Sequence, residues 1–398
     1  MYRIQTLNKV SKIGIELFSR DSYEVASEIV NPDAILVRSA NMLDMQIPES
    51  VKAVARAGAG VNNIPVDRCS ASGVVVFNTP GANANGVKEL VLAGLLLSSR
   101  KIVPGVLWAK GLAGQADVPS LIEKGKSQFG GPEIKGKSLG VVGLGAIVVM
   151  VANDALGLGM QVTGYDPFIS VEAAWGLSRN VKRARSLESL LAESDYVTLH
   201  VPLNGDTKGL INRERFALMK KGARLLNLAR GPLVDNEALH AALSAGIVST
   251  YVTDFPDDDV LKLDNVISFP HLGASTPEAE DNCAVMAVNQ LRAFLELGNI
   301  RNSVNFPDCE LDMFGAAKRI VIANRNIPNM VGQISTILAG ESINISDMIN
   351  RHKRDYAYNI MDVEGEVRPN LIDRLRGIDG VLMVRVIDPT AEEQSQEK

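Results

Sequence analysis

The sequence predicts an α/β protein with a small parallel α/β domain, a larger doubly wound parallel sheet and a C-terminal βαββαβ module. Three observations carry this prediction. Short β-rich runs alternate with helical patterns early in the chain. Six more such runs follow from Ser138, the first ending in a glycine-rich turn. Two further β–helix patterns come after a proline-containing loop. A length of 398 residues also exceeds one simple core, so two or three domains are expected.

The smaller domain is predicted from three β-rich runs that end in turn residues: AILVRSA (34–40), VKAVARAGAG (51–60) and VVVFNTP (74–80). Helical patterns lie between them, and this alternation is typical of a parallel sheet. A long apolar-periodic helix over about 85–101 and a polar, glycine-rich stretch around 125–136 follow.

The larger sheet is predicted from six β-rich runs separated by helical segments. After them, a helix over 277–297 is expected to return the chain to the smaller domain, which therefore consists of two chain segments. We place the smaller domain at 1–97 with 285–307 and the larger one at 98–284. The six runs are SLGVVGLG, MQVTGYD, YVTLHVP, ARLLNLAR, VSTYVTDF and NVISFPH.

The C-terminal module is expected over 318–390, after the segment NIRNSVNFPDCELD, which we interpret as a linker. Its pattern is strand, helix, strand, strand, helix, strand, the order of a ferredoxin-like fold. The polar tail AEEQSQEK is expected to be disordered.

Composition excludes several classes of protein. A net charge of −5 argues against nucleic-acid binding and against a basic membrane face. The longest apolar run, Leu90 to Leu97, is shorter than the roughly 18 residues of a membrane helix. The isolated cysteines Cys69, Cys283 and Cys309 predict neither a disulfide framework nor a metal site. We therefore expect a cytoplasmic protein without metal.

The turn after SLGVV has the features of a dinucleotide site. Gly143 permits a tight turn, Gly145 lets the backbone approach a pyrophosphate at the helix N-terminus, and Asp166 ends the next strand. A carboxylate there binds ribose hydroxyls and repels a 2′-phosphate, so NAD is favoured over NADP. Val148 replaces a third glycine and is expected to push the helix outward slightly. A plain βα turn without ligand is the alternative interpretation.

Three later segments lie at strand ends, where ligands bind in open α/β sheets. Arg230 follows a buried strand, and its guanidinium could bind a carboxylate through two parallel hydrogen bonds. The alternative interpretation is an ordinary surface arginine. His271 is placed for general-base work near neutral pH. The run DFPDDD (254–259) contains a carboxylate that could orient the His271 ring; the alternative interpretation is a solvated acidic loop.

Several motifs together resemble the D-2-hydroxyacid dehydrogenase family: VRSA, RAGAGVNN, GLGAI, NLARG and PHLGAST, in this order. The segment PNMVGQISTILAGESINI resembles an ACT domain. The resemblance implies a flavodoxin-like substrate domain, an NAD-binding Rossmann domain and a C-terminal regulatory ACT domain. It further implies oxidation of 3-phospho-D-glycerate to 3-phosphohydroxypyruvate, the first step of L-serine biosynthesis. Another 2-hydroxy acid, as in glyoxylate or hydroxypyruvate reduction, and a catalytically weak NAD- or serine-sensing protein are the alternatives.

The resemblance also implies site residues. His271 matches the acid/base, and Arg230 the residue that binds the substrate carboxylate. The third catalytic member is normally a glutamate; Asp258 or Asp259 takes its place here, because the DFP segment is one residue shorter than usual. Cofactor contacts carried over are Gly143, Gly145, Ala146, Ile147, Asp166, His200, Val201, Pro202, Thr207, Leu228, Ala229, Arg230, Asp254, His271, Gly273 and Ala274.

Substrate and effector contacts follow in the same way. Arg38 and Arg56 are the expected phosphate holders, beside Ser39, Gly58 and Ala59. An L-serine effector is expected at the asparagines of the ACT segment, although a dimerising sheet that binds nothing is the alternative. A homodimer or homotetramer is expected. The effector residues are Asn324, Asn326 and Asn344.

Overall fold

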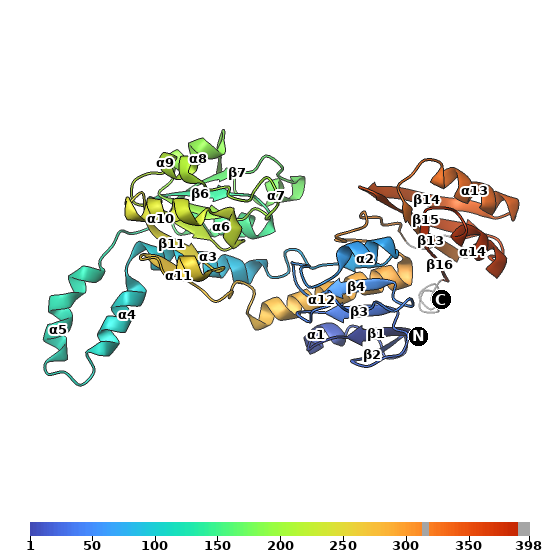
Figure 1. Ribbon diagram of the computed structural model, residues 1–398, viewed down its shortest axis with the longest axis horizontal. Helices are drawn as coiled ribbons and strands as arrows, with labels where there is room; N and C mark the ends of the chain where they lie inside the picture. The colour runs from blue at the N-terminus through green and yellow to red at the C-terminus, as the bar shows by residue number, and fades with distance from the viewer. Residues whose placement is uncertain (313–317, 389–398) are drawn as a thin grey trace. The chain divides into compact units, whose positions relative to one another are not determined.

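The structure, a computed structural model, describes residues 1–312 and 318–388, so the predicted disordered tail lies outside the described residues (Figure 1). The chain divides into two compact units. Unit 1 comprises Met1–Asn83 and Glu280–Lys398, and unit 2 comprises Ala84–Ala279. The boundary therefore lies at Asn83 rather than at residue 97.

Unit 1 begins with a five-stranded parallel sheet in the order β2-β1-β3-β4-β5, the order of flavodoxin-like folds. Three strands coincide with the predicted β-rich runs, whereas β1 and β2 were not predicted. Buried side chains of α12 complete the core of this sheet. The elements are β1 (Tyr2–Thr6), α1 (Lys12–Ile15), β2 (Tyr23–Ala26), β3 (Ala34–Val37), β4 (Ala53–Arg56), α2 (Val66–Ala71), β5 (Val75–Phe77) and α12 (Pro277–Leu297).

Unit 2 contains a seven-stranded parallel sheet in the order β12-β11-β10-β9-β6-β7-β8, which confirms the doubly wound fold. The order reverses between β6 and β9, so ligands are expected at the carboxyl ends of these strands. The strands are β6 (Ser138–Val142), β7 (Gln161–Tyr165), β8 (Lys182–Arg183), β9 (Tyr196–Leu199), β10 (Ala223–Asn227), β11 (Val248–Thr253) and β12 (Val266–Ser268).

The helices of unit 2 lie between and beside these strands. The long helix α3 belongs here rather than to the smaller domain, because its buried face packs in the same core as Val141 and Val252. The helices are α3 (Ala84–Ser99), α4 (Ile102–Gly111), α5 (Val118–Gly125), α6 (Ala146–Gly157), α7 (Val171–Gly176), α8 (Leu187–Glu193), α9 (Arg213–Leu218), α10 (Asn236–Ser244) and α11 (Asp258–Leu261), with 3₁₀ turns at Lys126–Phe129 and Gly231–Leu233.

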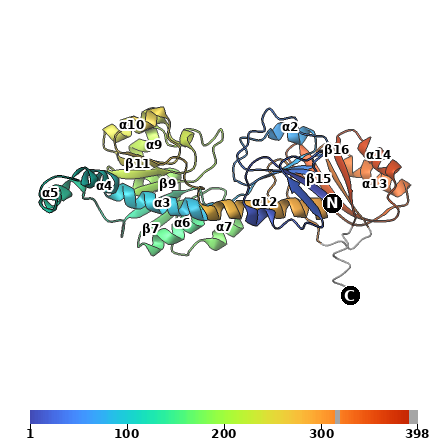
Figure 2. The same ribbon diagram turned by 90° about the horizontal axis from the view of Figure 1, so that it is seen from below.

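Helices α4 and α5 form a hairpin that projects from the rest of unit 2 (Figures 1 and 2). It lies between the predicted long helix and the glycine-rich stretch, over residues for which the sequence analysis made no prediction. Neither helix has a buried residue, and Val106 and Leu107 are exposed. Among the described residues no single helix is long and apolar enough to cross a membrane, although α3 and α4 together, bent by 68°, reach that length and composition.

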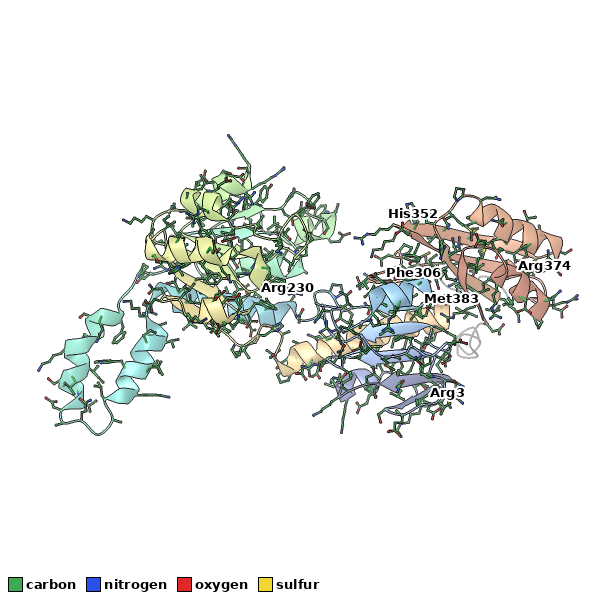
Figure 3. All side chains as sticks on the ribbon, viewed as in Figure 1. Arg3, Arg230, Phe306, His352, Arg374 and Met383 are labelled. Carbon is green, nitrogen blue, oxygen red and sulfur yellow. The ribbon has the colours of Figure 1, made fainter. Side chains whose placement is uncertain are left out.

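The C-terminal module has the predicted βαββαβ order, folded as an antiparallel sheet with strand order β14-β15-β13-β16. One face of the sheet packs under α13 and α14. The opposite face, including Val321 and Tyr358, shares a core with Phe294 of α12 and with Phe306 (Phe306 labelled in Figure 3). The elements are β13 (Lys318–Arg325), α13 (Met330–Gly340), β14 (Asn344–Lys353), β15 (Tyr356–Glu364), α14 (Pro369–Arg376) and β16 (Val381–Ile387).

The segment interpreted as a linker is instead part of the core of unit 1. Phe306 is fully buried, and the buried Asn305 side chain bonds to the backbone of Val74 and Val76 and to the Ser70 hydroxyl. Polar groups paired in this way hold the segment against β5. The C-terminal module is therefore joined to the first sheet by packed chain.

Candidate active site

The turn between β6 and α6 requires its first glycine. Gly143 has φ +87°, and a Cβ there would lie 3.0 Å from Val201 Cγ1 and 3.1 Å from the backbone of His200. Gly145 precedes the helix, and a Cβ there would meet no atom within 4 Å. This open space faces the start of α6, whose first N–H groups have no partner within a helix. The turn fits a pyrophosphate.

Val148, at the position of the third glycine, is buried in the core of unit 2. Helix α6 nevertheless starts at Ala146 and includes Ile147 in its first turn, as the site requires. The valine side chain is thus accommodated in apolar packing. Its predicted outward push on the helix stays a prediction.

Asp166 lies directly after β7 and reaches across the glycine turn. Its Oδ2 accepts the N–H of Leu144 at 2.7 Å, and its Oδ1 accepts that of Phe168 at 2.8 Å. A carboxylate accepts about four hydrogen bonds, so further acceptor positions remain for ribose hydroxyls. The Asp166 side chain is half-buried, and its hydrogen bond from the Leu144 N–H fixes it against the glycine turn.

The loop after β9 carries His200, Val201, Pro202 and Thr207. The His200 ring lies 2.8 Å from the Thr198 hydroxyl, and burial lowers the pKa of His200 to about 4. This imidazole is therefore neutral near pH 7 and lines the loop without adding charge. The Thr207 hydroxyl donates to the carbonyl of Pro202 at 2.6 Å, which closes the loop on itself.

Asn227, which sequence reasoning missed, shapes the turn that carries Leu228, Ala229 and Arg230. Its side chain is fully buried; Nδ2 donates to the Arg230 carbonyl at 2.8 Å, and Oδ1 accepts the N–H groups of Ala229 and Arg230 at 3.3 Å each. A buried amide at the end of the apolar run LLN is the signal that could have identified it.

Asp254 positions the loop that carries His271. It is buried, and its two oxygens accept the N–H groups of Leu272 at 2.7 Å and Gly273 at 2.8 Å. His271 itself has a left-handed backbone with φ +54° and is exposed, as Ala274 is in part. Asp254 therefore holds the backbone directly after His271 and is not a surface acid.

The structure brings Arg230 and His271 together at one aromatic ring. The centroid of the Phe255 ring lies 4.5 Å from the centroid of the His271 ring. The guanidinium carbon of Arg230 lies 5.4 Å from the same Phe255 centroid. Arg230, labelled in Figure 3, is exposed and donates to the Ala229 carbonyl. A cation and an imidazole in one place, at the carboxyl edge of a parallel sheet, can bind a carboxylate and move a proton.

The two candidate aspartates lie on the first turn of α11 and are largely exposed. Asp258 pairs with Lys262, and Asp259 lies 3.9 Å from the same ammonium. Within the described residues no hydrogen bond joins either carboxylate to the His271 ring. Their pairing with His271 stays a prediction.

The five predicted substrate residues of unit 1 cluster at the ends of β3 and β4. Arg56 Nε donates to the Arg38 carbonyl at 3.0 Å, and Gly58 N–H donates to the Arg56 carbonyl at 2.9 Å. The Arg38 guanidinium pairs with Glu280 of α12, and both are part-exposed. The remaining members are held by asparagines: Asn8 donates to Ser39 and Asn78 donates to the Ala59 carbonyl.

A cavity of about 180 Å³ in the C-terminal module contains two of the three predicted effector residues. Asn324 and Asn326 line it together with Asn329 and Asn350. Asn329 has φ +66°, a conformation that asparagine tolerates in place of glycine. Asn344 instead bonds to Glu364 at the other end of β14.

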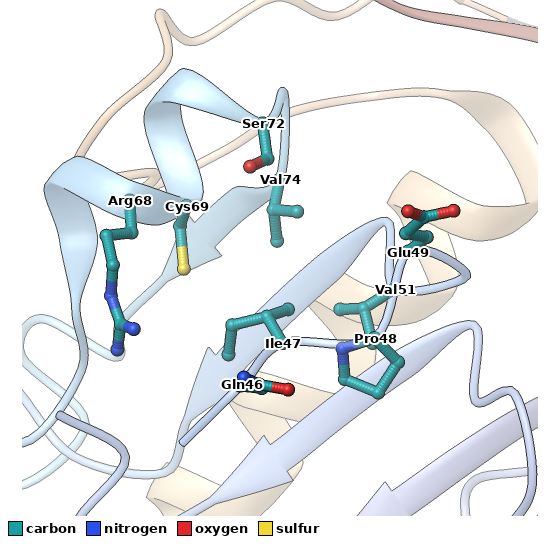
Figure 4. A pocket seen from close by; sticks show the side chains of 9 residues that line it. All are labelled: Gln46, Ile47, Pro48, Glu49, Val51, Arg68, Cys69, Ser72 and Val74. Atoms are coloured by element: carbon teal, nitrogen blue, oxygen red, sulfur yellow. The ribbon is translucent and has the colours of Figure 1, made fainter. Parts of the chain in front are cut away.

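A second cavity, of about 720 Å³, lies beside α2 in unit 1 and contains no predicted site residue (Figure 4). Its Arg68 guanidinium is already occupied by the carbonyls of Leu43 and Met45. Burial raises the pKa of the Cys69 thiol to about 11, so this sulfur is neutral near pH 7.

Comparison with known proteins agrees with this geometry. Residues 108–273 match the family model "D-isomer specific 2-hydroxyacid dehydrogenase, NAD binding domain". D-3-phosphoglycerate dehydrogenase of Haemophilus influenzae is 32% identical over 96% of this chain and 94% of that protein. The enzyme of the same name from Methanocaldococcus jannaschii is 35% identical over 78% of this chain, which spans 59% of that longer protein.

Solved structures are similar as well. NAD⁺-bound 3-phosphoglycerate dehydrogenase of Entamoeba histolytica aligns with a TM-score of 0.59 and 26% identity, over 76% of this chain and 98% of that one. The TT0316 protein of Thermus thermophilus aligns with a TM-score of 0.62 and 29% identity, over 76% of this chain and 99% of that one.

Proposed function

The chain belongs to the D-isomer-specific 2-hydroxyacid dehydrogenase family, and from this premise we propose that it oxidises 3-phospho-D-glycerate to 3-phosphohydroxypyruvate with NAD, the first step of L-serine biosynthesis. The observation that carries the proposal is the meeting of Arg230 and His271 at the Phe255 ring. These are the cation and the base that oxidation of a 2-hydroxy acid needs.

The glycine turn and Asp166 would hold the cofactor. The N–H groups at the start of α6, beside Gly145, would bind the pyrophosphate, and the Asp166 carboxylate would accept hydrogen bonds from the ribose hydroxyls. The negative charge at Asp166 disfavours a 2′-phosphate, so NAD is preferred over NADP. Bound NAD supplies the hydride acceptor, nicotinamide C4, for the hydrogen on substrate C2.

The protein residues bind the acid and move the proton. Arg230 binds the substrate carboxylate and polarises the C2 oxygen. His271 accepts the C2 hydroxyl proton as the hydride leaves C2, so the alcohol becomes a ketone and the imidazole becomes an imidazolium. Neutral His200 adds no competing positive charge to the loop.

The phosphate of the substrate is proposed to bind Arg38 and Arg56. Two guanidinium forks neutralise a dianion well, and the hydrogen bond from Arg56 to the Arg38 carbonyl holds the two segments together. Glu280 pairs with Arg38 in the structure, so a bound phosphate must compete with this carboxylate. This contact favours a ligand with more negative charge than a simple carboxylate.

A second candidate function is an NAD-binding regulatory protein with little turnover. The observation that favours it is the exposed position of Asp258, paired with Lys262 rather than with His271. A base without an acidic partner is expected to be slower, since a carboxylate stabilises the protonated ring. Turnover measurements separate the two functions.

Regulation, assembly and location are further parts of the proposal. The asparagine-lined cavity of the C-terminal module, which we regard as an ACT domain, is proposed to bind L-serine. Exposed apolar side chains on α4, including Val106 and Leu107, support a homodimer or homotetramer. The three free, buried thiols accord with a reducing cytoplasm.

The test is NADH formation from NAD and 3-phospho-D-glycerate, followed at 340 nm, for the wild type and His271→Ala. Loss of the base is expected to lower kcat by about 10²–10⁴-fold. Glyoxylate, hydroxypyruvate and added L-serine are assayed in parallel. Equal traces for the two proteins contradict the enzymatic proposal and favour the regulatory one.

A further inference from the structure

Phe255 contacts both side chains to which the reaction is assigned. Its ring lies 4.5 Å from the His271 ring, at an interplanar angle of 50°, and 5.4 Å from the Arg230 guanidinium carbon. Both contacts come from one half-buried side chain, placed directly after Asp254 by the short DFP segment. We propose that Phe255 is a positioning residue that orients the His271 imidazole and the Arg230 guanidinium for one substrate; this rests on the proposed function.

The backbone around Phe255 is fixed independently of its ring. The Phe255 N–H donates to the Thr253 hydroxyl at 3.1 Å, and the preceding Asp254 is buried and bonded to Leu272 and Gly273. Asp254 and Phe255, two consecutive residues, therefore contact different parts of the loop that carries His271. Asp254 holds its backbone, and the Phe255 ring lies against its side chain.

The arginine turn is also packed on Phe255. A Cβ at Gly231 would lie 3.2 Å from the Phe255 carbonyl oxygen and 3.6 Å from its Cβ. The segment after β10 thus approaches the Phe255 backbone closely, and the buried Asn227 side chain bonds to the Arg230 carbonyl in the same turn. Arg230 is exposed, and two contacts limit the directions of its long side chain: the hydrogen bond to the Ala229 carbonyl and the Phe255 ring.

The charged groups nearby do not provide this orientation. The Asp254 oxygens accept the N–H groups of Leu272 and Gly273, and Asp258 and Asp259 lie exposed on α11 beside Lys262; within the described residues no hydrogen bond joins these carboxylates to the side chain of Arg230 or His271. An aromatic face attracts a guanidinium and an imidazolium and still excludes water from one side of each. One ring can therefore orient the Arg230 guanidinium and the His271 imidazole toward one anionic substrate.

The test compares Phe255→Leu with Phe255→Tyr, which keeps the ring, and with Leu261→Ala, which removes an exposed apolar side chain from α11. We expect F255L to lower kcat about tenfold or more and to raise KM for 3-phospho-D-glycerate several-fold, since both catalytic groups lose their orientation. F255Y is expected within about twofold of the wild type, and L261A unchanged.

An NMR measurement distinguishes failure of this inference from failure of the proposed function. In ¹³C-histidine-labelled protein, the His271 ring signal is the one missing from H271A. Removal of the aromatic ring in F255L is expected to shift that signal, whether or not the wild type turns over 3-phospho-D-glycerate. An unmoved signal in F255L, or unchanged kcat and KM in an active protein, overturns the positioning role.

Discussion

At the scale of single residues, the predictable part of the site lies at strand ends. Gly143 and Asp166 directly follow β6 and β7, and Arg230 and His271 lie just beyond β10 and β12. Because carboxyl ends of parallel strands meet at one edge, glycine, acid, arginine and histidine in these places predict a site. Phe255 was not predicted, since its role depends on contacts with residues on two other loops.

The glycine turn gives the sharpest prediction at this scale. Gly143→Ala forces a Cβ to within 3.1 Å of the His200 backbone at φ +87°, where L-residues are strained. We expect the free energy of unfolding to fall by about 1–3 kcal/mol and NADH binding to weaken at least tenfold. Urea unfolding and a fluorescence titration with NADH measure the two effects.

The matched control is Gly157→Ala, at the other end of α6. A Cβ there would meet no atom within 4 Å, so alanine is expected to be neutral or to stabilise by up to about 1 kcal/mol. NADH affinity is expected to stay at its wild-type value. If G143A binds NADH as tightly as G157A, the turn does not hold the pyrophosphate.

At the scale of elements, runs of β-branched residues identified most strands, and contacts distant in sequence decided the rest. Strand β1 was missed because its sequence YRIQT mixes polar and apolar residues, and only Ile4 is fully buried. The segment around Asn305 was interpreted as a linker because its partners, Ser70 to Val76, lie far away in the chain. Neither feature leaves a local signal.

The C-terminus of α12 is held by arginines of the C-terminal module, which the sequence also did not reveal. Arg385 of β16 donates to the carbonyls of Phe294 and Leu295 at 3.1 and 2.8 Å, and its guanidinium lies 4.5 Å from the Phe294 ring centroid. Arg319 of β13 donates to the Leu297 carbonyl and pairs with buried Asp362. Cations there complement the helix dipole.

Arg385→Met tests this cap. Removal of the guanidinium breaks its two hydrogen bonds to the carbonyls of Phe294 and Leu295, which keep the Gly298 N–H and the Tyr2 hydroxyl as donors, so we expect the free energy of unfolding of unit 1 to fall by about 1.5–3 kcal/mol. Arg385→Lys keeps the positive charge but loses the planar, two-pronged guanidinium, so its free energy of unfolding is expected to lie between those of the wild type and Arg385→Met. Arg376→Ala, an exposed arginine of α14, is the control, with a change within about 0.5 kcal/mol in urea unfolding.

At the scale of the whole molecule, the two units differ from the domains that the sequence suggested. The C-terminal module shares one hydrophobic core with the first sheet, and α3 packs in the core of unit 2. Linker-like composition therefore did not mark a boundary here, because Phe306 and Asn305 are buried in unit 1. Packing makes the C-terminal module and the first sheet one unit.

This organisation predicts two calorimetric transitions, one for each unit, rather than three for three domains. We propose above that NADH binds the glycine turn of unit 2; at about 100 times its Kd it is then expected to add about 2.7 kcal/mol to the stability of that unit and to raise its transition by several degrees. Arg385→Met is expected to lower only the other transition, since Arg385 bonds within unit 1. If the C-terminal module melts separately, or R385M moves the NADH-sensitive transition, the shared core does not make unit 1 cooperative.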